Sequence, residues 1–300
     1  MKNPIARFFS QQKILTTFYL YSFVFQALIR SIVPVMTAAN YSTGRRVTVL
    51  FLEFWFFIKA VVSIVLRKAW QEERFLGYTM RFPNYLEFAF LFIEIFGIQE
   101  YRLRTQKKRP RIIDCGSGWG MSILYFKHCY PNASILAVEA NTDIVPLFRG
   151  NLIRNGIGDV TIKTSFVCGR EGQHPFYRYD AFDGWSISNT GAVDCVGTNA
   201  DFKKTTVPSR SLASLLRHGA DAVKLDIEGM EGEAIMSARK ELESVREVLI
   251  EHHPGMNSAH NAFRDILRIL KSAGFYVTYV NTKTFVLRKN ALRTIYARRT

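Results

Sequence analysis

The sequence predicts an α/β protein: a mostly parallel, seven-stranded sheet with a terminal antiparallel strand, preceded by apolar N-terminal helices. The 300 residues are 48% hydrophobic, which is enough to bury a substantial core. After about residue 105, short apolar runs alternate with longer amphipathic segments, as in a parallel sheet covered by helices. Near the C-terminus, two β-rich runs flank Asn281 and Thr282, which predicts a hairpin and thus an antiparallel strand.

The N-terminal region contains two apolar segments. Residues 14–29 carry no charge, and residues 47–66 are interrupted by Glu53 and Lys59. The first segment is shorter than the roughly 20 residues of a membrane-spanning helix, and the second contains charges, so neither is assigned as one. Two interpretations remain open: helices that lie in a membrane interface, and helices that fold onto the rest of the chain.

Charge is concentrated at the two ends of the chain. The formal net charge is +15; residues 1–68 contain nine Lys and Arg and one acid, and residues 266–300 contain eight and no acid. The part between them is nearly neutral, which argues against a nucleic-acid groove across it. Basic ends beside apolar segments fit an anionic membrane surface, with a merely solvated basic surface as the alternative.

The expected location is the cytoplasm, with the cytoplasmic face of a membrane as a variant of it. Arg30 and Pro34 directly follow the first apolar segment, where a small-residue cleavage site would stand, so a cleaved signal peptide is not expected. The cysteines show neither metal-site nor disulfide-framework spacing. We interpret all four as reduced thiols: Cys115, Cys129, Cys168 and Cys195.

A domain boundary is expected near residue 105, because the segment 102–111, RLRTQKKRPR, is polar and strongly basic. It separates an apolar, basic helical region, residues 1–104, from a second domain, residues 105–300. An aromatic helix over residues 86–97 precedes the boundary. The predicted strands of the second domain are 111–115, 134–139, 160–167, 221–226 and 246–252, and its predicted helices are about 119–129, 142–155, 231–242 and 259–273.

The most specific motif is RIIDCGSGWG, residues 111–120, in which a strand, a glycine loop and a helix follow in order. Glycines let the backbone turn tightly and approach a ligand, and the helix N-terminus offers free N–H donors. Met121 replaces the last glycine of the dinucleotide pattern G-x-G-x-x-G, which favours a cofactor without pyrophosphate. The predicted cofactor contacts in this motif are Asp114, Gly116, Ser117, Gly118 and Gly120.

A carboxylate at the end of the next strand is predicted to bind a ribose. Glu139 lies nineteen residues after Gly120, where a second parallel strand would present it beside the glycine loop. Such a carboxylate accepts hydrogen bonds from both ribose hydroxyls. Ala140 and Asn141, which follow it, complete the predicted cofactor contacts.

Two further strand ends carry candidate catalytic groups. In DAVKLDIEGMEGEAI, residues 221–235, Asp226 and Glu228 lie at the C-terminal end of an apolar strand, where ligands bind in such sheets; a helix-capping pair is the alternative. In VREVLIEHHP, residues 245–254, the adjacent strand delivers Glu251, His252 and His253 to the same edge. Either imidazole could remove a proton from a hydroxyl, and we favour His252 over His253.

Together, DCGSGWG, VEA, VKLDIEGMEGEAI and EHHP resemble the motifs of the FkbM-type methyltransferase family, over roughly residues 75–290. The resemblance implies a Rossmann-like class I methyltransferase fold, S-adenosylmethionine as cofactor, and O-methylation of a sugar, glycan, glycolipid or related metabolite. It implies cofactor contacts for Gly116 to Gly120 and Glu139, and active-site roles for Asp226 and Glu228. The loop departs from the family pattern D-x-G-A-N, because Ser117 and Gly118 stand where the family has Ala and Asn.

The expected activity is therefore methyl transfer to a hydroxyl. Asp226 or His252 would take the hydroxyl proton directly; a divalent cation held by Asp226, Glu228 and Glu251 is the less favoured route, and no metal ligand is assigned. Two other readings are an RNA methyltransferase and a non-catalytic, membrane-associated module that binds the cofactor. The first lacks the Asn-Pro-Pro-aromatic motif, so nucleic acid is an unlikely partner, and the intact acids argue against the second.

Overall fold

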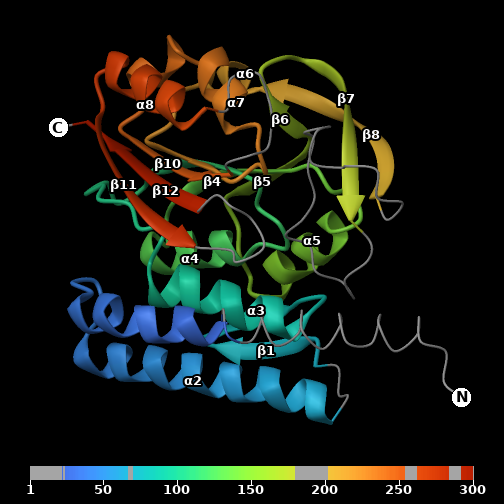
Figure 1. Cartoon of the computed structure of the whole chain (residues 1–300), viewed down its shortest axis with the longest axis vertical. Helices are drawn as coiled ribbons and strands as arrows, with labels where there is room; N and C mark the ends of the chain where they lie inside the picture. The colour runs from blue at the N-terminus through green and yellow to red at the C-terminus, as the bar shows by residue number, and fades with distance from the viewer. Residues whose placement is uncertain are drawn as a thin grey trace, which may run out of the picture. The chain divides into compact units, whose positions relative to one another are not determined.

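The computed structural model describes residues 22, 24–66, 70–179, 202–253, 262–283 and 292–299 (Figure 1). The chain divides into two compact units. The first contains Met1–Gly77 and Asn84–Glu100, and the second contains Tyr78–Pro83 and Tyr101–Thr300. Residues 78–83 and 101–104, which were expected in the N-terminal region, are thus grouped with the second unit.

The first unit is mainly helical, and aromatic side chains form its core. The ring of Phe56 makes edge contacts with Phe75, Phe88 and Phe92, with centroids 6.4, 4.9 and 5.0 Å apart. Within the described residues, no helix has the length and apolar character required to cross a bilayer. The elements of the first unit are a helix over residues 24–37, α2 (Thr43–Val65), β1 (Glu72–Phe75), α3 (Tyr85–Phe92) and the π-helix η1 (Ile93–Gly97).

The second unit contains the predicted seven-stranded sheet, in the order β11-β12-β10-β9-β3-β4-β5. Six strands are parallel, and β12 is antiparallel to both of its neighbours, β10 and β11. The prediction of a mostly parallel sheet with one antiparallel strand is therefore confirmed. The strands are β3 (Arg111–Cys115), β4 (Ser134–Glu139), β5 (Val160–Thr164), β9 (Ala222–Leu225), β10 (Glu247–His252), β11 (Tyr276–Lys283) and β12 (Leu292–Arg298).

The predicted position of the terminal hairpin is wrong. Asn281 and Thr282 lie inside β11, because the ladder to β12 continues through them and pairs Asn281 with Arg293. The antiparallel strand therefore comes later in the chain than expected, and it lies between β10 and β11 and not at the edge of the sheet.

Helices cover both faces of this sheet (Figure 1). The core beneath α7 and α8 includes Val223, Leu225, Ile250 and Ile295, each fully buried. The predicted helix over 231–242 is shorter than expected, since α7 ends at Ser237 and a 3-10 helix follows. The helices are α4 (Met121–Cys129), α5 (Val145–Arg154), α6 (Leu212–Leu216), α7 (Glu231–Ser237), η3 (Glu241–Ser244) and α8 (Phe263–Ser272).

A second, three-stranded sheet in the order β6-β8-β7 was not predicted. The predicted strand 160–167 divides at Ser165, whose hydroxyl donates to the Pro208 carbonyl at 3.1 Å and so ties the chain to the new sheet. Trp185, for which the sequence leaves open an acceptor platform or a structural lid, and Cys195 lie outside the described residues. None of the three described cysteines forms a disulfide with another described residue. The remaining strands are β2 (Tyr78–Arg81), β6 (Phe166–Cys168), β7 (Gly172–Tyr179) and β8 (Phe202–Ser211).

Candidate active site

The glycine loop between β3 and α4 lies directly against the end of β9. Gly116 has φ 81°, and a Cβ atom there would lie 1.8 Å from the backbone oxygen of Asp226, so only glycine fits. Gly118, also with positive φ, has open space where its side chain would be. The loop thus combines a tight contact to the end of β9 with open space at Gly118.

Glu139 holds the glycine loop in place. Its Oε2 accepts a hydrogen bond from the Gly118 amide at 2.8 Å, and its Oε1 accepts one from the Asn141 amide at 2.8 Å. Burial raises the pKa of Glu139, although these two amides act in the opposite direction. Each carboxylate oxygen keeps a lone pair, so hydrogen bonds from ribose hydroxyls remain compatible with this arrangement. Ala140 is half-buried beside it.

Asp114, predicted as a cofactor contact, is fully buried and faces the protein interior. Its Oδ2 accepts a hydrogen bond from the Ser122 hydroxyl in the first turn of α4 at 2.5 Å, and its Oδ1 lies 3.2 Å from the Lys224 ammonium. Ser117 also turns inward and donates to the Asp114 carbonyl at 3.0 Å. These two side chains therefore shape the loop, and the loop backbone, Glu139, Ala140 and Asn141 remain predicted cofactor contacts.

Lys224, which the sequence analysis gave no role, connects the loop to the acids. Its ammonium donates to the Gly116 carbonyl at 2.7 Å and forms ion pairs with Asp114 and, at 3.4 Å, with Asp226 Oδ2. Burial lowers the pKa of Lys224, but the carboxylates of Asp114 and Asp226 outweigh it and raise the pKa above its usual value. A fixed positive charge therefore lies between the two halves of the site.

Tyr101 was missed by the sequence analysis, although it contacts both strand-end carboxylates. Its hydroxyl lies 3.3 Å from Asp226 Oδ2 and 3.3 Å from Glu251 Oε2, and the Lys224 ammonium lies 5.0 Å from its ring centroid. No local pattern marks this residue, because it precedes the first strand of the domain and reaches the site only through the fold.

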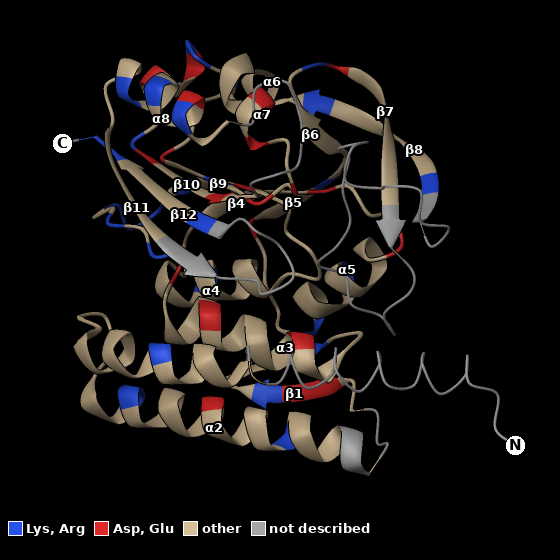
Figure 2. Cartoon of the chain, in the orientation of Figure 1, with Lys and Arg blue, Asp and Glu red and all other residues tan. Residues whose placement is uncertain are grey.

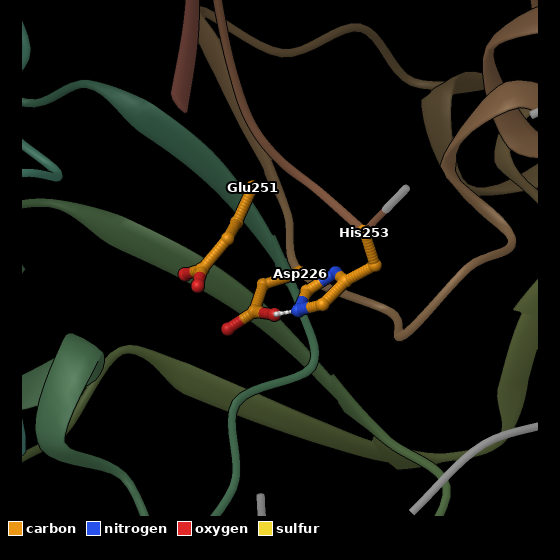
Figure 3. Close-up of side chains that lie close together, drawn as sticks. All are labelled: Asp226, Glu251 and His253. Atoms are coloured by element: carbon orange, nitrogen blue, oxygen red, sulfur yellow. Dashed lines mark ion pairs between the residues drawn. The ribbon is translucent and has the colours of Figure 1, made fainter. Parts of the chain in front are cut away.

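His253 is the histidine that the structure brings to the acids, as Figure 3 shows. Its Nδ1 donates to Glu231 Oε1 at 3.0 Å, which directs Nε2 towards Glu228 Oε2 at 3.6 Å and Asp226 Oδ1 at 3.9 Å. Burial alone would lower the pKa of His253, but Glu228, Glu231 and Glu251 raise it well above its usual value. The surrounding carboxylates therefore favour the protonated imidazolium.

Glu228 adopts the left-handed conformation, with φ 51°, which is strained for a residue with a side chain. Burial raises its pKa to about 8, with Asp226 and Glu251 acting in the same direction and His253 opposing them. Glu231 behaves differently: burial raises its pKa, but bonding to His253 and to the Gly229 amide brings it below the ordinary value. Glu231 was also missed, although its place in the first turn of α7 could have been read as a capping position.

His252, the histidine favoured from the sequence, has a different environment. It is fully buried, and its ring packs against Phe263 with centroids 5.5 Å apart. Successive side chains of a strand point to opposite sides, so Glu251 and His253 share one side of β10 and His252 points to the other. The structure therefore brings His253, and not the expected His252, to the acids.

The residues able to hold a cation also differ from the expected set. Asp226, Glu251 and His253 each offer one ligand atom, and these atoms lie within 4.8 Å of one another in the described part of the chain. The set expected from the sequence contained Glu228 in place of His253. Two of the three are buried, and their oxygen and nitrogen donors suit several divalent ions.

The chain is similar to several solved methyltransferases, each at low identity. Precorrin-6y C5,15-methyltransferase from Geobacter metallireducens GS-15 shows 17% identity and a TM-score of 0.38, over 69% of this chain and 89% of that one. An O-methyltransferase from Bacillus cereus in complex with SAH shows 13% and 0.38, over 64% and 75%. Magnesium protoporphyrin IX methyltransferase from Synechocystis PCC 6803 with bound SAH shows 16% and 0.37, over 64% and 74%.

The family assignment comes from a sequence match. The model of the methyltransferase FkbM domain matches residues 114–277, which is more than half of the chain and includes the glycine loop, Glu139 and the acidic cluster. None of the curated proteins matches the chain. The chain therefore belongs to the FkbM methyltransferase family, as an S-adenosylmethionine-dependent methyltransferase of the class I fold.

Proposed function

We propose that this protein transfers a methyl group from S-adenosylmethionine to a hydroxyl of a sugar, glycan, glycolipid or related metabolite. The observation that carries the proposal is the cluster of carboxylates and one imidazolium at the carboxyl ends of β9 and β10, directly beside the glycine loop. A hydroxyl is a weak nucleophile that must lose its proton, and this cluster supplies acceptors for it.

The methyl donor would occupy the carboxyl edge of β3 and β4. The residues that fit it are the backbone of the glycine loop, with open space at Gly118, and Glu139, whose carboxylate has capacity for ribose hydroxyls. When bound, the donor supplies an electrophilic methyl group on a sulfonium. Lys224 and Gly116 couple this region to Asp226 through a hydrogen bond and a close backbone contact.

Asp226 is the residue we assign as the proton acceptor. In this role the Asp226 carboxylate takes the hydroxyl proton as the acceptor oxygen is methylated by the donor, which would leave as its demethylated thioether. Asp226 is half-buried, so it can face an acceptor, whereas its Oδ2 stays oriented by Lys224 and Tyr101. Correct placement of the two reacting groups provides much of the acceleration.

His253 supports this step by its charge and does not take the proton. As an imidazolium it cannot accept one, but its Nε2 lies beside the oxygens of Asp226 and Glu228, where its positive charge offsets their negative charges before the proton is transferred. Glu231 fixes the ring from the other side. The reaction in this form needs no metal ion.

The test is a transfer assay with labelled S-adenosylmethionine and fractionated glycans, lipids and metabolites, run on the wild type and on Asp226→Asn. We expect a labelled ether product, a loss of on the order of a hundredfold or more in kcat for the variant, and unchanged binding of the donor by calorimetry. Asp265→Asn, on the exposed surface of α8, is the matched control. Donor binding without transfer to any fraction would favour the non-catalytic module, and full activity of Asp226→Asn would remove Asp226 as the base.

A further inference from the structure

The helices of the first unit expose an unusual amount of apolar surface. Among the described residues, fifteen large hydrophobic side chains are exposed, and eleven of them lie between residues 25 and 66. Soluble proteins rarely leave so many neighbouring apolar side chains in water without a partner. The eleven are Phe25, Ile29, Ile32, Val33, Met36, Val47, Phe51, Phe54, Trp55, Ile58 and Leu66.

Ten of these side chains form two stripes of five, one on each of two helices, and both stripes have the same spacing. In the helix over residues 24–37 they occupy positions 25, 29, 32, 33 and 36, and in α2 they occupy 47, 51, 54, 55 and 58. Steps of four, three, one and three residues place a set on a single helical face. The opposite faces are buried and include Ser31 and Val35 in one helix and Val49 and Glu53 in the other.

The two helices run antiparallel and are in contact. The Ser31 hydroxyl donates to Glu53 Oε2 at 2.7 Å, Val35 packs in one cluster with Val49, and the rings of Phe25 and Phe57 lie 5.8 Å apart. Positions that rise along the first helix therefore pair with positions that fall along the second.

This pairing brings the stripes together on one side. Each stripe occupies the same five positions relative to the bonded pair Ser31 and Glu53: six and two residues before it, and one, two and five after it. When two helices run antiparallel, residues at the same sequence distance and direction from two contacting residues point to the same side of the helix pair. The ten side chains thus make a single two-helix surface, which we call the apolar face.

The two helices themselves carry mainly basic residues, one of which, Lys59, is paired with Glu73 of β1. Residues 24–66 contain four Lys and Arg and one acid, and the acid, Glu53, is fully buried in the helix contact. Arg30 is exposed, and Figure 2 shows that most of the length of these helices carries no charge. The apolar face is therefore flanked by positive charge without any exposed acid between residues 24 and 66.

We infer that the apolar face binds the surface of a membrane that contains anionic lipids, with its side chains among the headgroups and upper acyl chains. The two stripes supply the buried apolar area, Trp55 and the three phenylalanines prefer the interface, and the basic residues attract lipid phosphates. A second copy of the chain would also cover an apolar face, but it would bring the same positive charges together, which favours the lipid as occupant.

The test is co-sedimentation of the full chain with neutral phosphatidylcholine vesicles and with vesicles that also contain phosphatidylglycerol. The variant carries Phe51→Asp and Trp55→Asp, and both side chains are exposed, at 62% and 47%. The control is Ile153→Asp, an 80% exposed side chain of α5 in the second unit. Circular dichroism melting curves of all three proteins would show whether the substitutions leave the fold intact.

We expect strong binding to the anionic vesicles, weaker binding to the neutral ones, and at least about a tenfold loss of partition for the double variant but not for the control. Wild-type protein that stays in solution with anionic vesicles would overturn the inference. So would a double variant that binds as well as the wild type. Sedimentation velocity provides the remaining outcome: a wild-type dimer that the double variant converts to monomer would make the face an interface between copies and refute the lipid assignment.

Discussion

Replacement of Glu53 by glutamine is expected to stabilise the protein at alkaline pH. Glu53 is fully buried in the helix contact of the first unit; its Oε2 accepts the Ser31 hydroxyl, and its Oε1 lies where a Cβ of Gly97 would be, 1.7 Å from that position. Burial raises its pKa from 4.5 to about 8, and the Ser31 hydrogen bond lowers it only in part. The folded protein thus holds the Glu53 proton more tightly than the unfolded chain does.

The magnitude follows from the linkage between proton binding and folding. Because the pKa is higher in the folded state, the contribution of the proton is fully present below pH 4.5 and is lost as the pH rises through about 8. A rise from 4.5 to about 8, at about 1.4 kcal/mol for each pH unit, corresponds to roughly 5 kcal/mol as an upper figure. Glutamine has nearly the same shape and cannot ionise, so the variant does not lose this folding free energy as the pH rises.

The assay is urea unfolding of the wild type and Glu53→Gln at several pH values from below 4.5 to above 8. The two free energies of unfolding should be similar at the acidic end and should diverge with rising pH, with the variant several kcal/mol more stable at the alkaline end. Glu72→Gln, an exposed acid of β1, is the control and should follow the wild type. Parallel curves for the wild type and Glu53→Gln would refute the reasoning.

Three further predictions concern the active site. Glu139→Ala should weaken donor binding by about ten- to a hundredfold in calorimetry, because a charged acceptor of the Gly118 amide is removed; an unchanged Kd would reject the role of Glu139. Glu231→Gln should lower kcat by on the order of tenfold, shift the alkaline limb of the pH–rate profile and leave the acceptor KM nearly unchanged, since the orientation and charge of His253 depend on Glu231; an unaltered profile would argue against it. Activity should survive EDTA, and a loss that Mn²⁺ restores would instead assign Asp226, Glu251 and His253 as ligands.

The parts of the site that the sequence predicted are local in the chain. Each consists of a strand, a short loop and the start of a helix, so the spacing itself places Gly116, Glu139 and Asp226 at the carboxyl edge of the sheet. Five of the seven strands, β3, β4, β5, β9 and β10, were predictable for the same reason, because their apolar runs are short and bounded. The sequence could not indicate which way Asp114 turns, since that depends on a hydrogen bond to Ser122 in the next helix.

The parts that were missed depend on contacts between distant segments. Tyr101 reaches Asp226 across 125 positions of sequence, and Lys224 reaches Gly116 across 108. The choice between His252 and His253 was different, because the two-residue period of a strand already places Glu251 and His253 on one side. The strand period in the sequence therefore favours His253. The position of the terminal hairpin, in contrast, depends on the ladder between β11 and β12, which no local sequence signal marks.

The contact between Gly116 and the backbone of Asp226 has a consequence for how this enzyme can diversify. Any side chain at position 116 would push the glycine loop and Asp226, the proposed proton acceptor, apart at once, so a change there cannot alter one without disturbing the other. Segments outside this contact must therefore accommodate new acceptors, and related chains that differ in substrate should keep glycine at position 116.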